Sequence, residues 1–196
     1  DALIWPQNYP SVFHVRVLAA QCQVQWLAAD LPAMLRVARQ VLIFSGQLHL
    51  AQMQKWGAYY VGSIYHAWNE LEQAVEVLEP AVRQPAASHA SAFANASCAL
   101  AATYQAQGRA AEASGVLNAA IDFLRTANRT YLPMVQTFAA ELALRQHAVG
   151  RAAQLVVQQP TVRPDTPAFH FLAPQLVRPK VLLALGQPTA RQEAAA

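Results

Sequence analysis

Two stretches of the sequence decide its fold, GSIYHAWNELEQA at residues 62–74 and LAATYQAQGRAAEA at residues 100–113. In each, a small residue is followed by an aromatic residue, a helix-breaking residue and three apolar residues, at intervals of three, four, five, four and three. The first series is Gly62, Tyr65, Asn69, Ala74, Leu78 and Ala81, and the second is Ala101, Tyr104, Gly108, Ala113, Leu117 and Ala120. Identical spacing in two places indicates an internal repeat.

The spacing within each copy predicts a pair of helices. The small residue lets two helices cross closely, the aromatic residue one turn later fills the space beside it, and Asn69 or Gly108 ends the first helix. The apolar positions that follow recur at helical intervals and form a stripe on the second helix. Such a hairpin cannot bury its apolar face alone, so we expect an all-α stack of hairpins laid in a row.

Fainter copies on both sides extend the repeat over the whole chain. The expected turns begin at Ala29, Asn69, Gly108, Gly150 and Gly186, which are 40, 39, 42 and 36 residues apart. These turns predict five hairpins within a single domain of residues 1–196, the last one truncated. Their approximate ranges are 11–47, 50–85, 89–128, 130–160 and 168–196.

The fourth copy departs from the pattern. Counting from Gly150 as its turn, Ala143 is the small residue, and Gln146, Leu155 and Gln159 occupy the later positions. We expect its second helix to be short, because several prolines follow between residues 159 and 167, where we expect a loop.

Two further prolines bear on helices. Pro80 predicts a kink or an early end of a helix near Ala81, and Pro179 stands where the last copy should have its small residue, which puts the first helix of that copy in doubt.

With these motifs the chain resembles the tetratricopeptide (TPR) superhelical region of MalT-like, large ATP-dependent LuxR-type transcriptional regulators. The resemblance rests on the two quoted stretches, on ELALRQ at residues 141–146 and on FLAPQLVRPKVLLALG at residues 171–186, and it runs from about Ser11 to the end. Pro179 and Lys180 depart from the Ala-Arg pair that is usual in this family. The resemblance implies an upstream ATPase module and a downstream DNA-binding domain in the parent protein, for which these helices sense an inducer or a regulatory protein.

Composition and motifs exclude several other classes. The 14 basic residues are scattered singly against 11 acidic ones, so we expect no direct contact with nucleic acid. No apolar run is long enough to span a membrane, and two cysteines without a zinc spacing favour a reduced, cytoplasmic protein. Neither a phosphate-binding loop nor a paired-histidine or nucleophile motif is present, so we expect no enzyme, metal or cofactor. A first residue that is Asp and a tail ending in three alanines suggest a fragment of a longer protein.

Binding is expected on the concave face, which the first helix of each hairpin should line. Counting from the small residue of each copy, the side chains expected there are Arg16, Gln23 and Trp26 on the first hairpin, Trp56, Tyr59, Ser63 and His66 on the second, and Asn95, Cys98 and Gln105 on the third. Aromatic rings among amide and imidazole groups suit a sugar-like or peptide ligand.

Each of these side chains also has a purely structural interpretation. Aromatic residues at helical spacing are more often core than ligand contacts, and we expect Tyr60, Tyr65, Trp68, Phe93 and Tyr104 to be packing residues. A lone histidine such as His66 is more often a hydrogen-bonded structural residue than a ligand. The leading hypothesis is a sensor that binds a small inducer, and the alternative is a protein interaction scaffold of the same fold.

Overall fold

The computed structural model describes residues 10–85, 89–156 and 174–186. Within these ranges the chain is helical and has no strand. The helices are α1 (Val12–Leu27), α2 (Leu31–Gln47), α3 (Ala51–Ala67), α4 (Leu71–Arg83), α5 (Ala90–Ala106), α6 (Ala110–Ala127), α7 (Leu132–Arg145), α8 (Val149–Val156) and α9 (Val177–Ala184), with short 3-10 turns η2 (Arg129–Tyr131) and η3 (Pro174–Leu176). The expectation of an all-α protein is confirmed.

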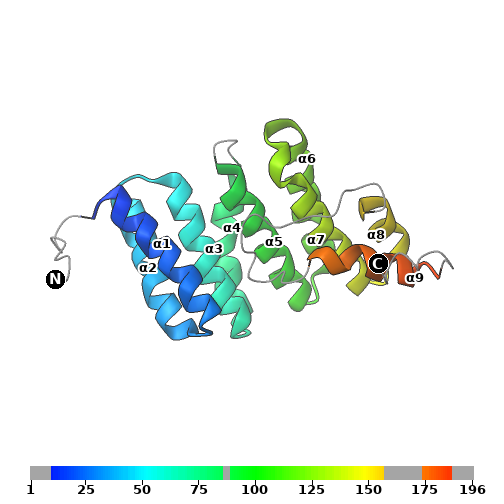
Figure 1. Ribbon diagram of the computed structural model, residues 1–196, viewed down its shortest axis with the longest axis horizontal. Helices are drawn as coiled ribbons and strands as arrows, with labels where there is room; N and C mark the ends of the chain where they lie inside the picture. The colour runs from blue at the N-terminus through cyan, green and yellow to red at the C-terminus, as the bar shows by residue number, and fades with distance from the viewer. Residues whose placement is uncertain (1–9, 86–88, 157–173, 187–196) are drawn as a thin grey trace.

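The helices form antiparallel hairpins that stack in a row (Figure 1). Each helix packs against its sequence neighbours, and the first helices α1, α3, α5, α7 and α9 also contact one another in that order. The first helices therefore form one continuous layer, and we call its surface the inner face. Helices α1 to α8 fall within the first four predicted hairpin ranges, and α9 falls within the fifth, whose residues 187–196 lie outside the described part of the chain.

The turn inside each hairpin contains one residue in the left-handed backbone conformation. These residues are Ala29, Asn69, Gly108, His147 and Gly186, with φ between 54° and 76°. They are 40, 39, 39 and 39 residues apart. The repeat is therefore more regular than the sequence suggested.

The predicted turn at Gly150 is wrong, because Gly150 lies inside α8 and the chain turns at His147. Counted from His147, the small residue of the fourth copy is Ala140, not Ala143. The later apolar positions are Ala152 and Val156, both buried, in place of Leu155 and Gln159. The error arose because a glycine marked the expected turn, whereas histidine also adopts the left-handed conformation.

The core is built from the same positions in every hairpin. The small residues are Cys22, Gly62, Ala101 and Ala140, and each is buried where a first helix crosses its partner. At Gly62 the crossing is so close that an added Cβ would lie 2.4 Å from Leu78 Cγ. Small residues at these points set the distance between the two helices of each hairpin.

Both prolines inside helices have a local explanation. α4 continues past Pro80 but ends at Arg83 after 13 residues, whereas α2 and α6 have 17 and 18. The early end predicted near Ala81 is thus found within one turn. The doubt over the last first helix was misplaced: Pro179 is the third residue of α9, where a backbone N–H has no intrahelical partner, so α9 forms around it. The proline-rich loop predicted at 159–167 lies outside the described residues.

Several aromatic predictions can be compared with burial. Tyr60, Phe93 and Tyr104 are buried and Tyr65 is half-buried, as expected of packing residues. Trp68 is an exception, being 37% exposed at the C-cap of α3. Across the described ranges, no helix combines the length and the apolar character that crossing a membrane requires.

Candidate binding site on the inner face

The largest hollow on the inner face lies across four first helices and has a volume of about 410 Å³. It is lined by Trp26 from α1, Ser63, His66 and Ala67 from α3, Ala102, Gln105 and Ala106 from α5, and Phe138, Glu141, Leu142 and Arg145 from α7. We call it the inner pocket. Four of the side chains expected on the concave face meet here: Trp26, Ser63, His66 and Gln105.

The inner pocket is a product of the repeat. Its lining contains three rows of residues that are 39 or 40 positions apart: Trp26, His66 and Gln105; Ser63, Ala102 and Glu141; Ala67, Ala106 and Arg145. Each row runs along the stack, with one member on each successive first helix. Because the packing of the hairpins repeats, these side chains must converge although they are far apart in sequence.

His66 is held in a defined protonation state by Thr103 of α5. The Thr103 hydroxyl lies 3.2 Å from His66 Nδ1 and donates its single proton to the Ala99 carbonyl oxygen at 2.9 Å. Nδ1 must therefore donate to Thr103, which leaves Nε2 of the neutral ring as a hydrogen-bond acceptor. Burial, and secondly the charge of Arg145, lowers the pKa of His66 below 6.5, so the ring is neutral at pH 7.

Ser63 contributes a polar atom with an unmet requirement. Its Oγ is buried and has no hydrogen-bond partner within the described residues. A buried hydroxyl without a partner is unfavourable by about 1–3 kcal/mol. A ligand group that reached Ser63 would relieve this cost.

Gln105 is positioned by the next hairpin. Its Oε1 accepts a hydrogen bond from Gln146 Nε2 at 2.7 Å, and Gln146 Oε1 accepts one from Ser114 Oγ at 3.3 Å. The amide of Gln105 is thus oriented before any ligand arrives, which reduces the entropy lost on binding.

The charged residues of the pocket largely neutralise one another. The carboxylate of Glu141 lies 3.3 Å from Arg145 and 3.1 Å from Lys180 of α9. With Trp26, Phe138, Leu142 and three alanines making up most of the lining, the pocket is apolar with a few polar groups. That composition is typical of sites that bind an uncharged group.

A smaller hollow of about 260 Å³ lies next to it, between α1 and α3. Arg16, Gln23 and Trp56, all expected on the concave face, line it together with Met53 and Tyr60. The Trp56 ring stacks on that of Tyr60 with 5.7 Å between centroids, so the floor is a rigid aromatic surface.

Three expected residues do not reach the surface. Tyr59 and Asn95 are wholly buried, and Cys98 is 2% exposed. These positions turn toward the second helices, and the Asn95 amide donates a hydrogen bond to Ser91 O within its own helix. Counting from the small residue had assigned every polar or aromatic residue of a first helix to the inner side, although part of that surface packs into the hairpin.

The missed residues come from α7. Phe138, Glu141, Leu142 and Arg145 were not predicted because the fourth copy was read from Gly150. The signal was present in the spacing: Glu141 follows Ser63 by two repeats of 39 residues, and Arg145 follows Ala67 by the same interval.

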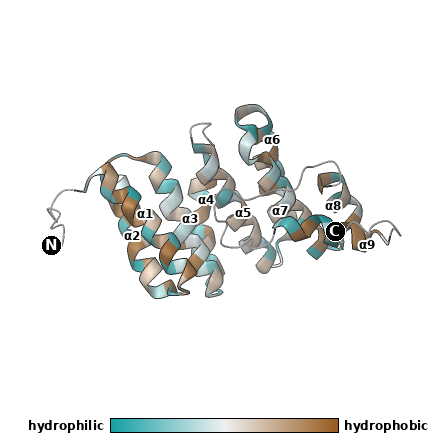
Figure 2. Cartoon of the chain, viewed as in Figure 1, coloured by the Kyte–Doolittle hydropathy of each residue, from teal (hydrophilic) through white to brown (hydrophobic). Residues whose placement is uncertain are grey.

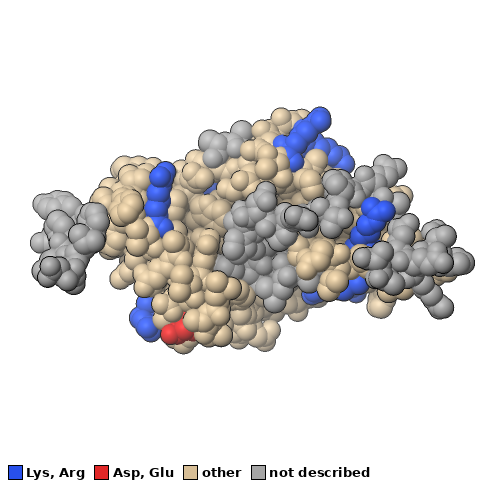
Figure 3. All heavy atoms as spheres, in the orientation of Figure 1, with Lys and Arg blue, Asp and Glu red and all other residues tan. Residues whose placement is uncertain are grey.

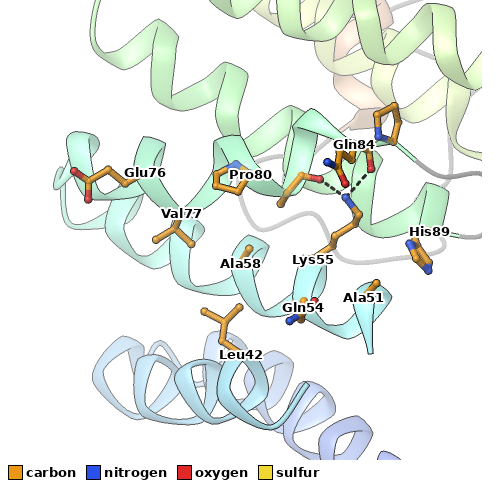
Figure 4. A pocket seen from close by; sticks show the side chains of 12 residues that line it. Leu42, Ala51, Gln54, Lys55, Ala58, Glu76, Val77, Pro80, Gln84 and His89 are labelled. Atoms are coloured by element: carbon orange, nitrogen blue, oxygen red, sulfur yellow. Dashed lines mark hydrogen bonds between the residues drawn. The ribbon is translucent and has the colours of Figure 1, made fainter. Parts of the chain in front are cut away.

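A hollow of about 660 Å³ lies outside the inner face, between α2, α3 and α4 (Figure 4). Its one lysine, Lys55, donates hydrogen bonds to the carbonyl oxygens of Ala81 and Gln84 at 2.7 and 2.9 Å. Those carbonyls end α4 early because of Pro80, and Lys55 satisfies them as a helix C-cap. The polar group of this hollow is therefore already used by the fold.

The described residues offer little for catalysis. No group of three or more His, Cys, Asp or Glu side chains in these ranges has the geometry of a metal site. Both cysteines are buried free thiols, and desolvation raises the pKa of Cys22 to about 12 and that of Cys98 further still. A thiolate nucleophile is therefore disfavoured at either position.

The surface charge is dispersed. Figure 3 shows Lys and Arg side chains at separate places on one side of the molecule. Several basic side chains are paired within a single helix, as in the exposed Arg83–Glu79 and Arg125–Asp122 ion pairs.

The fold has relatives among solved structures. Two crystal structures of a kinesin light chain-like protein from Podosopora anserina, built from nearly identical TPR-like repeats, superpose with TM-scores of 0.64 and 0.65. Their sequence identities to this chain are 20% and 19%, and each match covers 92% of this chain and 91% of the other. No protein-family model and no curated protein sequence matches the chain. The chain therefore has the fold of TPR-like repeat proteins, while its narrower resemblance to MalT-like regulators has no support from these comparisons.

Proposed function

We propose that this chain is a non-catalytic interaction scaffold, which holds a segment of a partner protein along its inner face. The observation that carries the proposal is the inner pocket, where Ser63 has an unsatisfied hydroxyl and His66 offers an acceptor among apolar side chains. A surface that already contains an oriented acceptor and an unmet hydrogen bond gains more from a bound group than a flat surface would.

The chemistry of the pocket favours one kind of anchor residue in the partner. The lining supplies apolar area from Trp26, Phe138 and Leu142 together with the acceptor of His66. An aromatic or amide side chain that carries an N–H or O–H, such as Tyr, Trp or Asn, would match both. The ion pairs around Glu141 leave no unbalanced charge for a strongly ionic anchor.

The test is selection of binding peptides from a random library, followed by affinity measurement with two matched variants. Ala106→Trp places a large ring in the inner pocket, and Ala111→Trp places one on the exposed side of α6. We expect selected peptides to share an aromatic or amide residue and to lose at least about tenfold in affinity with Ala106→Trp, a change of about 1.4 kcal/mol. Equal affinity for both variants would refute the inner pocket as the binding site.

A second candidate is the sensor of a MalT-like LuxR-type regulator, which binds a small inducer and acts on other domains of a longer, cytoplasmic chain. The supporting observation is the volume of about 410 Å³, within the range of about 300–1,000 Å³ typical of small-molecule pockets. A sugar, amino-acid or nucleotide that raises the melting temperature of the wild type but not of Ala106→Trp would favour this candidate over the scaffold. In neither case does this segment itself need to contact nucleic acid or a membrane.

A further inference from the structure

Helix α1 has an apolar stripe on the side turned away from the rest of the protein. Phe13, Val17, Ala20, Val24 and Leu27 follow one another at intervals of four, three, four and three residues, which places them on one side of a helix. Val17, Val24 and Leu27 are 47, 62 and 86% exposed. Figure 2 colours much of α1 as hydrophobic.

The stripe lies opposite the buried side of the same helix. At 100° per residue, its centre is about 170° from that of the core residues Val15, Leu18, Ala19 and Cys22. A helix that is apolar on both sides is normally covered on both sides.

The internal repeat shows what covers this side elsewhere. The residues 40 positions after Val17, Ala20 and Val24 are Gly57, Tyr60 and Ile64 of α3, and all three are buried. The same positions are buried in α5 (Ala96, Ala99 and Thr103) and in α7 (Val135, Phe138 and Leu142). In α3 this side packs on the preceding α2, where a Cβ on Gly57 would lie 2.9 Å from the Leu42 side chain. The stripe of α1 therefore corresponds to a surface that is an established helix interface in every later hairpin.

We propose that a second copy of this chain covers the stripe, with the two α1 helices packed antiparallel about a two-fold axis near Ala20. The order of side-chain sizes is the reason for choosing a second copy. Read in either direction, the stripe runs from large to medium to small to medium to large. In an antiparallel pair, Phe13 faces Leu27 of the other copy, Val17 faces Val24, and the two Ala20 residues meet where the helices are closest.

Charge presents no obstacle to this arrangement. Arg16 is the only charged residue of α1. In the antiparallel pair the two arginines stand eight residues apart along the axis, about 12 Å, where their repulsion is screened at ordinary salt concentration.

The mass of the full chain in solution tests the proposal, by light scattering across micromolar to hundred-micromolar concentrations. The wild type should show twice the mass of one chain. Val24→Glu should weaken the dimer by at least about tenfold, since it buries an unpaired carboxylate against an apolar surface. Ile43→Glu, at an exposed aliphatic residue on α2, is the matched control and should leave the dimer intact.

A charge pair and a cross-link distinguish this geometry from a folding defect. The double variant Val17→Lys with Val24→Glu places each lysine against a glutamate of the other copy and should restore dimers. Ala20→Cys should form a disulfide between copies under mild oxidation, because the native Cys22 and Cys98 are buried. A monomeric wild type, a dimer indifferent to Val24→Glu, or failure of both the double variant and the cross-link would overturn the proposal.

Discussion

Replacing Gly62 by alanine probes the closest helix crossing in the stack. The new Cβ would lie 2.4 Å from Cγ of Leu78 and 2.7 and 2.8 Å from its two Cδ atoms. Leu78 is wholly buried and its Cγ is a branch point, so the side chain cannot move aside without disturbing α4. Overpacking of this kind costs about 1–3 kcal/mol, or more where the contact is very short.

A second effect has the opposite sign. Alanine is favoured over glycine inside a helix by about 1 kcal/mol. At Gly62 we expect the steric cost to exceed this gain, with a net loss of about 1–2 kcal/mol. Gly115 of α6 is the control, because it is exposed and a Cβ there would have no neighbour within 4 Å. Gly115→Ala should therefore stabilise the protein by up to about 1 kcal/mol.

Equilibrium urea unfolding, followed by far-UV circular dichroism, measures both variants. The decisive comparison repeats Gly62→Ala in a Leu78→Ala background, where the obstructing side chain is gone and the substitution should become stabilising. If Gly62→Ala raises the urea midpoint as much as Gly115→Ala does in the wild-type background, the close crossing is not a packing constraint and the reasoning fails.

Two further predictions concern polar contacts between hairpins. Tyr104→Phe removes the hydroxyl that donates to Glu79 Oε1 at 2.6 Å, and it should cost about 1 kcal/mol in urea unfolding, at the low end for a charged hydrogen bond because Glu79 stays partly in water; an unchanged midpoint would contradict this. His66 has a folded-state pKa below 6.5, so between the two values the unfolded chain binds more protons and stability should fall as the pH drops below about 6.5. In His66→Gln this part of the decrease should be absent, and an identical pH profile would show that another group is responsible.

The repeating spacing of small and apolar residues was enough to predict the fold. Those residues pack within one hairpin or against the next, so their rules are local, and Gly62, Ala74 and Leu78 obey them as expected. The prediction failed where the backbone conformation did not follow the obvious residue type, as at His147, where the turn was assigned to Gly150 instead.

The candidate site was predicted in part. Trp26, Ser63, His66 and Gln105 were selected as polar or aromatic residues of the first helices, and they do converge. Tyr59 has the same character but faces the core, because a rotation of one or two residues around a helix changes which surface a side chain meets.

Sequence alone determined that the chain is a row of helical hairpins, since an apolar stripe that repeats every 39 or 40 residues can be buried only by its neighbours. Tertiary structure alone decided which side chains share a pocket. The neutral tautomer of His66, the unpartnered hydroxyl of Ser63 and the approach of Glu141 from two hairpins away depend on distances between helices. Those distances are set by the sum of all the packed side chains between the helices, and no single motif contains that sum.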